Sequence, residues 1–117
     1  MTSLDIVKIA VQAADSKKGH EIRVIKIRDI SVLADYFVFV SGDSNTQTRA
    51  IAEEVEFKLS GAGEEPHHIE GWQSGWICLD YGSVVVHVFH KEQRQYFQLE
   101  RLWEDGEEID PSTLLEN

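Results

Sequence analysis

The sequence predicts a single α/β domain with a mixed β-sheet of about five strands flanked by helices. Its 117 residues suit one domain that buries its own core, and its composition is that of an ordinary globular protein. Helix-like and strand-like segments follow one another in the order helix, two strands, helix, three strands, helix. A helical crossover after the second strand allows parallel pairing, whereas a hairpin further along requires antiparallel pairing.

Residues 3–18 predict the first helix, with Ser3 as its N-cap and Gly19 at its end. Apolar side chains recur there at helical spacing and form one stripe, made of Ile6, Ile9, Ala10 and Ala13. Residues 22–28 predict a strand. Residues 36–40, YFVFV, are continuously apolar, which is typical of a central strand covered on both faces.

The second helix is predicted to begin at Ser44 and to run to Leu59. Ser44 and Gln47 have the spacing of a capping box, in which the first side chain caps the helix and the second reaches back. A short strand is predicted near residues 67–70. Because Pro66 cannot donate to a strand ladder, this strand should start after Pro66 or lie at an edge of the sheet.

Residues 76–89, WICLDYGSVVVHVF, predict a β-hairpin with Gly82 and Ser83 as its turn. Residues directly opposite each other share a face, so one side of this hairpin is wholly apolar. That apolar face is made of Ile77, Leu79, Tyr81, Val84, Val86 and Val88. The other face pairs aromatic side chains with an acid, a thiol and an imidazole, and it consists of Trp76, Cys78, Asp80, Val85, His87 and Phe89.

Residues 91–103 predict the last helix. It should present large apolar side chains on one side, namely Tyr96, Leu99 and Trp103. The final residues, 104–117, are acidic and include glycine and proline. We therefore expect the folded domain to span residues 1–103 and residues 104–117 to form a mobile acidic tail.

Charge and cysteine content bound the function. The chain has 11 Lys and Arg residues against 21 Asp and Glu residues, a formal net charge of −10. This balance argues against a direct grip on nucleic acid and suits a basic protein partner. The single cysteine permits no internal disulfide, which fits the cytoplasm. The first residues lack a signal-peptide pattern, and no apolar run approaches the ~20 residues of a membrane span.

The polar residues of the hairpin raise the question of catalysis. Cys78 lies opposite His87 and Asp80 is diagonal to it, so a nucleophile, a general base or a metal site is conceivable from residue types alone. No glycine-rich oxyanion loop is evident nearby, and Trp76 and Phe89 crowd the same face. The turn at residues 41–44 lacks the glycines and lysine of a phosphate loop. We therefore expect no catalytic residue, no metal site and no cofactor.

Three blocks of the sequence resemble the ribosomal silencing factor family, whose bacterial members are called RsfS and whose plant relative is Iojap. They are ADYFVFVSGDS at 34–44, EGWQSGWICLDYGSVVVHVF at 70–89 and YFQLERLW at 96–103. The resemblance covers roughly residues 3–103. It implies binding to a basic protein on the intersubunit face of the large ribosomal subunit, called L-fourteen in bacteria. It further implies blocked subunit joining, lowered translation when nutrients are short, and a homodimer away from the ribosome.

The resemblance also implies a nucleotidyltransferase-like fold. The alternative function is therefore a metal-dependent nucleotidyltransferase using Asp80 and Asp43. Residues 84–90 of the hairpin carry no acidic side chain. We therefore favour a protein that has the nucleotidyltransferase-like fold but lacks nucleotidyltransferase activity. The predicted partner-binding residues lie on the mixed face and turn of the hairpin: Trp76, Asp80, Tyr81, Gly82, His87 and Phe89.

Overall fold

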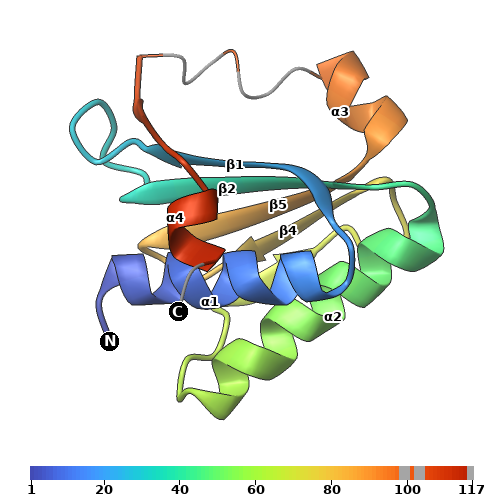
Figure 1. The fold of residues 1–117 in the computed structure, drawn as a ribbon, viewed down its shortest axis with the longest axis horizontal. Helices are drawn as coiled ribbons and strands as arrows, with labels where there is room; N and C mark the ends of the chain where they lie inside the picture. The colour runs from blue at the N-terminus through green and yellow to red at the C-terminus, as the bar shows by residue number, and fades with distance from the viewer. Residues whose placement is uncertain (98–100, 102–104, 116–117) are drawn as a thin grey trace.

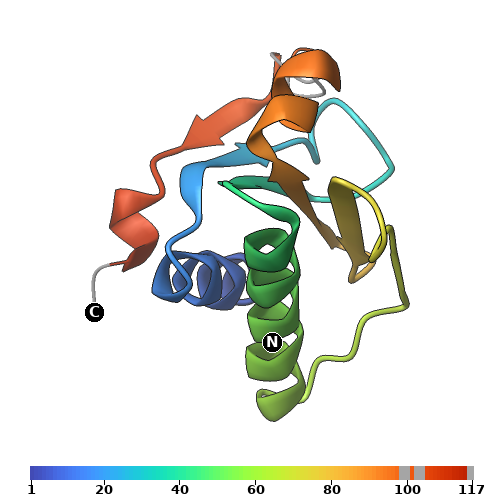
Figure 2. The ribbon, with the colours of Figure 1, turned by 90° about the vertical axis from the view of Figure 1, so that its right-hand side faces the viewer.

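The structure is a computed structural model that describes residues 1–97, 101 and 105–115, without the side chains of residues 95–97. A six-stranded sheet runs through the molecule in the order β3-β4-β5-β2-β1-β6. Two long helices, α1 and α2, lie side by side on one face of the sheet, and α3 lies against the other face at one end (Figures 1 and 2). The predicted α/β class with a mixed sheet is confirmed.

Five of the six strands match segments expected from the sequence. The strands are β1 (His20–Lys26), β2 (Tyr36–Gly42), β3 (His68–Glu70), β4 (Trp76–Asp80), β5 (Val84–His90) and β6 (Glu107–Ile109). β2 and β5 pair in parallel, and every other neighbouring pair is antiparallel. All residues of β2 are buried, as its continuous apolar run predicted. β3 begins two residues after Pro66 and lies at an edge of the sheet.

The first helix, α1 (Ser3–Ser16), has its N-cap one residue earlier than predicted. Thr2, not Ser3, is the N-cap, because Thr2 and Asp5 form a reciprocal capping box. The Ser3 hydroxyl instead donates to Asp35 at 2.7 Å. At the other end, where Gly19 was predicted to close the helix, Lys17 is the C-cap and Lys18 has a positive φ of 63°.

The second helix, α2 (Asn45–Gly61), is capped by Ser44 as predicted. The Ser44 hydroxyl accepts from the Gln47 amide at 3.1 Å. The Gln47 side chain reaches back one residue further than in a capping box, and its Oε1 accepts from the Asp43 amide at 2.6 Å. Its Nε2 donates to the carbonyl oxygens of Lys17 and Lys18. Gln47 therefore ties the start of α2 to the end of α1.

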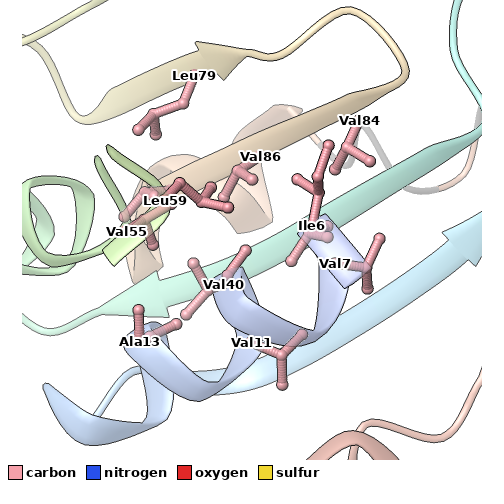
Figure 3. Packing of buried hydrophobic residues seen from close by; sticks show 14 of the residues in the cluster. Ile6, Val7, Val11, Ala13, Val40, Val55, Leu59, Leu79, Val84 and Val86 are labelled. Atoms are coloured by element: carbon pink, nitrogen blue, oxygen red, sulfur yellow. The ribbon is translucent and has the colours of Figure 1, made fainter. Parts of the chain in front are cut away.

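The main hydrophobic core lies between the helices α1 and α2 and one face of the sheet. Figure 3 shows side chains from both helices and from β2, β4 and β5 meeting there. The cluster is closed by aliphatic side chains with almost no exposed area, including Val11, Val40, Val55, Leu59, Leu79 and Val86. Because this burial involves all the long elements, the core fixes which face of the hairpin points inward.

The described part of the predicted tail belongs to the fold. Residues 107–109 form β6 beside β1, with Ile109 opposite Val24. A short helix, α4 (Ser112–Leu115), follows, and its Leu114 is only 7% exposed because it packs in the main core cluster. The folded domain therefore extends past residue 103, where its end was predicted, and includes β6 and the helix that follows it. Acidic composition predicted a solvated tail, but Ile109 and Leu114 are apolar side chains that the sheet and α1 can bury.

The last helix predicted from the sequence lies only partly within the described residues. α3 (Lys91–Phe97) covers the first half of the expected helix at residues 91–103. The predicted positions of Leu99 and Trp103 lie outside the described residues. In the part of the chain that the structure describes, no helix has the length and apolar character needed to cross a bilayer.

Candidate functional site

The β4–β5 hairpin has the register that the sequence predicts. Trp76 lies opposite Phe89, Cys78 opposite His87 and Asp80 opposite Val85. The intervening pairs are Ile77 with Val88 and Leu79 with Val86. The two faces of the hairpin therefore have the compositions expected, one wholly apolar and one mixed.

The turn of the hairpin depends on glycine. Gly82 has a φ of 83°, a conformation that L side chains rarely adopt. The Tyr81 amide donates to the Val84 carbonyl at 2.9 Å, and the Gly82 amide donates to Asp80 Oδ1 at 2.8 Å. A Cβ at Gly82 would come within 2.8 Å of the His67 ring. Asp80 thus holds the turn by a hydrogen bond from within the hairpin, and the ring of His67 lies against Gly82.

The apolar face of the hairpin is core, as predicted. Its six side chains all belong to the main cluster against α1 and α2, and Leu79, Val84 and Val86 are visible there in Figure 3. Tyr81 is part of this face and is 5% exposed. It was predicted to contact a partner, but its ring is packed in the core. Its hydroxyl is covered and has no hydrogen-bond partner in the described structure.

The mixed face carries a second, smaller cluster around His87. The His87 ring stacks on Phe39 with 5.1 Å between ring centroids, and Trp76 stacks on Phe89 at 5.2 Å. The Trp76 indole N–H donates to His87 Nδ1 at 3.2 Å, so the hydrogen-bond network assigns the ring proton of His87 to Nε2. Burial lowers the pKa of His87 to about 4, and the imidazole is neutral at pH 7.

Only part of the mixed face is accessible. Trp76, Asp80 and Val85 are half-buried, as is Gly82 in the turn. His87 is 5% exposed and Phe89 is 1% exposed. Their burial contradicts the expected accessibility of these two side chains. β2 contributes aromatic side chains to the same face, and α3 packs on β5 and β2. The aromatic side chains of β2 and the helix α3 therefore bury His87 and Phe89.

The arrangement does not support a Cys-His nucleophile. Burial, with the charges of Asp80 and Glu70, raises the pKa of Cys78 to about 11, which keeps the thiol protonated. His87 has its Nδ1 occupied by the Trp76 indole and its pKa lowered by burial. Both shifts move away from the thiolate and imidazolium forms that such a pair needs.

The two acids of the alternative function are far apart. Asp80 lies opposite Val85 at the start of β5, whereas Asp43 follows Gly42, which lies opposite His90 at the end of β5. The strand between them spans about 17 Å at about 3.3 Å per residue. Asp43 instead contacts His20 Nε2 at 2.8 Å and lies 3.8 Å from Lys91 Nζ. The fold therefore does not bring Asp43 and Asp80 into one metal site.

One buried polar contact was missed by the sequence analysis. Arg94 on α3 is 6% exposed, and its Nη1 donates to the Ser41 hydroxyl at 2.8 Å. This contact joins α3 to the end of β2. No local pattern signals it, because an arginine in an exposed-looking helical segment has the same neighbours in sequence whether or not the helix packs down.

Fold and site together define a small single-domain α/β protein with a mixed sheet, whose hairpin has a half-buried face with an aromatic and an acidic side chain. The family model described as "Ribosomal silencing factor during starvation" matches residues 1–117. The chain belongs to the ribosomal silencing factor family.

Individual relatives agree with this assignment. The chain is 38% identical over 111 residues to the ribosomal silencing factor RsfS of Halalkalibacterium halodurans, covering 94% of this chain and 95% of that protein. It is 40% identical over 107 residues to RsfS of Bacillus subtilis, covering 91% of each chain. It is also similar to the crystal structure of protein CV0518 from Chromobacterium violaceum, with a TM-score of 0.87, 34% identity and coverage of 94% and 92%.

Proposed function

We propose that this chain binds the large ribosomal subunit in the cytoplasm, at a basic protein of the intersubunit face, and prevents the small subunit from joining. Translation then falls when nutrients are short. Membership of the silencing-factor family over residues 1–117 carries this proposal. The net charge of −10 supports a basic partner, because complementary fields speed encounter and favour one orientation.

The accessible part of the hairpin is the proposed docking surface. Trp76 offers a large aromatic side chain, and Asp80 offers a carboxylate beside the turn at Gly82. Aromatic side chains with a polar rim are typical of interface anchors. His87 and Phe89 act indirectly in this proposal, because they hold the Trp76 ring in place by a hydrogen bond and by stacking.

The proposed mechanism is steric and needs no chemistry from the protein. A folded domain of this size docked on the intersubunit face occupies space that the small subunit must reach. The wide separation of Asp43 and Asp80 favours this regulatory function over the nucleotidyltransferase alternative. A homodimer formed away from the ribosome would compete with docking if it used the same hairpin face.

Sedimentation against separated ribosomal subunits tests the proposal. Tagged protein should travel with large subunits and show little association with small subunits. Asp80→Asn should weaken the association while keeping the oxygen that accepts from the Gly82 amide. A gradient at low salt and with excess large subunits that leaves all the protein in the soluble fraction would overturn the proposal.

Calorimetry separates the alternative. With nucleoside triphosphates and Mg²⁺ the protein should give no heat of binding. Binding in the micromolar range that Asp80→Asn abolishes would favour the nucleotidyltransferase function instead.

A further inference from the structure

The loop between β1 and β2, residues 27–35, exposes a group of large apolar side chains. Among the residues that the structure describes, six such side chains are exposed, and three of them lie in this loop. Ile30 is 44% exposed, Leu33 is 66% exposed and Val32 is fully exposed. Single exposed apolar residues are ordinary on a protein surface, whereas adjacent ones mark interaction sites. The loop is therefore a candidate contact surface.

Hydrogen bonds within the loop fix the backbone that carries these side chains. At the base of the loop the Ile27 amide donates to the Asp35 carbonyl at 2.8 Å. The amides of Ile30 and Ser31 donate to the Ile27 carbonyl at 2.9 and 2.8 Å. The Ser31 hydroxyl accepts from the Leu33 amide at 3.1 Å. Because the loop is already ordered in this way, little conformational freedom is lost when a partner binds it.

The base of the loop lies against the turn of the β4–β5 hairpin. The amides of Asp35 and Tyr36 donate to the Ser83 carbonyl at 2.7 and 3.1 Å. Figure 1 shows the loop projecting past the end of the sheet at which β2 begins, and β5 begins beside it. Ser83 follows Gly82, whose amide donates to Asp80. The loop therefore adjoins the part of the proposed docking surface that the turn forms.

The loop is also continuous with the aromatic cluster of the mixed face. Ile27 and Ala34, near the two ends of the loop, are buried in that cluster. Trp76 and Val85 pack against the same cluster from the hairpin. Trp76 is four residues from Asp80 along β4, which is about 13 Å at about 3.3 Å per residue. A protein interface of ordinary size, roughly 800 Å² on each partner, is wide enough to include Trp76, the turn and the loop.

The start of α1 adds to the apolar character of this end of the molecule. The Ser3 hydroxyl donates to Asp35 Oδ2 at 2.7 Å, and this bond joins α1 to the base of the loop. Met1 and Leu4, from the same segment as Ser3, are 56% and 43% exposed. In the described part of the chain, the one remaining exposed side chain of this kind is Phe57 on α2. The exposed apolar side chains are thus concentrated at one end of the sheet.

Charge indicates which kind of partner fits this end. A second copy would bring together two chains that each have a net charge of −10, and their repulsion opposes association. A basic protein is instead attracted by the same charge. Residues 30–34, ISVLA, carry no charge themselves. The surface that receives them should therefore be an apolar depression on a partner that is basic as a whole.

We propose that Ile30, Val32 and Leu33 form a contact surface, the loop tip, that packs into an apolar depression on the basic protein of the large ribosomal subunit. This inference rests on the proposed function, which supplies the partner. The loop tip contributes apolar area that is buried on docking, and Asp80 and the net charge contribute attraction and orientation. Charge then speeds the encounter, and the loop tip slows dissociation.

The kinetics of binding of the whole chain to isolated large subunits test the proposal. Val32→Ser with Leu33→Ser, the serine variant, should raise the dissociation rate about tenfold because it removes the apolar contact. Its association rate should stay within about twofold of the native value, because no charge changes. An unchanged dissociation rate would overturn the loop tip.

Phe57→Ser is the matched control. It removes an apolar side chain of similar exposure, 69% against 66% for Leu33, from α2. Both of its rates should stay within about twofold of the native values, because Phe57 lies outside the proposed contact. A dissociation rate raised equally in Phe57→Ser and in the serine variant would mean that exposed apolar area matters wherever it lies, and would overturn the loop tip.

Two further measurements separate binding from folding. The melting temperature of the serine variant should stay within a few degrees of the native value, because both side chains are exposed. Val32→Ile with Leu33→Met keeps the loop tip apolar and should bind subunits within about twofold of the native chain. A loss in this conservative variant as large as in the serine variant would overturn an apolar contact at the loop tip.

Sedimentation velocity of the free chain tests a second copy as the occupant. The native chain and the serine variant should sediment alike over a range of concentrations. Self-association that the serine variant loses, together with unchanged subunit binding, would assign the loop tip to a dimer and overturn the proposal.

The native chain keeps the two proposals distinguishable. If it does not bind large subunits, the proposed function fails, and the loop tip fails with it. If it binds them and the serine variant dissociates at the native rate, only the loop tip fails and the proposed function stands.

Discussion

At the scale of single residues, His87 decides how the mixed face behaves with pH. The ring is enclosed by Phe39 and Trp76 and accepts the indole N–H, so the fold requires the neutral form. A histidine of this kind serves as an aromatic packing element that also orients a neighbour. Its usual role as a proton carrier near pH 7 is suppressed by burial.

Acid should therefore destabilise the domain through His87. The pKa is about 4 in the folded protein against an ordinary value of 6.5, so the unfolded chain binds more protons between these values. The stabilisation is complete above pH 6.5 and is lost as the pH falls from 6.5 to 4, a loss on the order of 3 kcal/mol. Urea denaturation at several pH values measures it, and His87→Phe should flatten this part of the profile. An equally steep profile in His87→Phe would assign the acid sensitivity to other groups.

Gly82 is the residue on which the hairpin turn depends. Gly82→Ala should lower the free energy of unfolding by roughly 1–3 kcal/mol, because alanine disfavours a positive φ and its Cβ would meet the His67 ring. Thermal melting checks this. The matched control is Gly61→Ala in α2, where an added Cβ meets nothing within 4 Å and helix propensity favours alanine. A stable Gly82→Ala variant would show that the turn can adopt another conformation.

At the scale of elements, the parallel pairing of β2 and β5 organises the molecule. It places Phe37 beside Val85 and Phe39 beside His87, so the aromatic side chains of β2 complete the mixed face of the hairpin. The hairpin alone would leave that face open. Its two strands can form a register by themselves, but β2, from elsewhere in the chain, supplies the aromatic side chains Phe37 and Phe39 that pack against His87.

The C-terminal elements β6 and α4 should contribute to stability. Leu114 is almost fully buried, and its carbonyl accepts from Gln12 Nε2 at 3.2 Å. Leu114→Ala should therefore cost about 2 kcal/mol or more in the free energy of unfolding. Leu4→Ala, which truncates an exposed leucine of α1, is the control and should change it little. Equal, small effects of both substitutions in denaturant titrations would show that the C-terminal residues are loose in solution.

At the scale of the whole molecule, the charge of −10 should govern the rate of docking. Raising the salt concentration should weaken binding to large subunits mainly by slowing association, because exposed charges steer encounter and salt screens them. Stopped-flow or surface-based kinetics at several salt concentrations measure this. Binding of a neutral ligand to an apolar surface would show no such slope, so a salt-independent association rate would contradict a basic partner.

The sequence by itself determined the hairpin, the capped start of α2 and the central position of β2. Each follows from residues close together in the chain: a Gly-Ser turn between apolar runs, a serine three residues before a glutamine, and five apolar residues in succession. The family could also be recognised at this level, because each of its three sequence blocks is a continuous run of residues. Local patterns of this kind carry their information within a few residues.

Only the tertiary structure decided which faces are covered. His87 and Phe89 are buried because β2 and α3 pack over a hairpin face whose composition suggested exposure. β6 exists because Ile109 pairs with Val24, far earlier in the chain, and Asp43 and Asp80 are separated by the length of β5. Burial of a face depends on which distant segment of the chain packs against it. Acidic composition and side-chain alternation show only which side chains lie on that face.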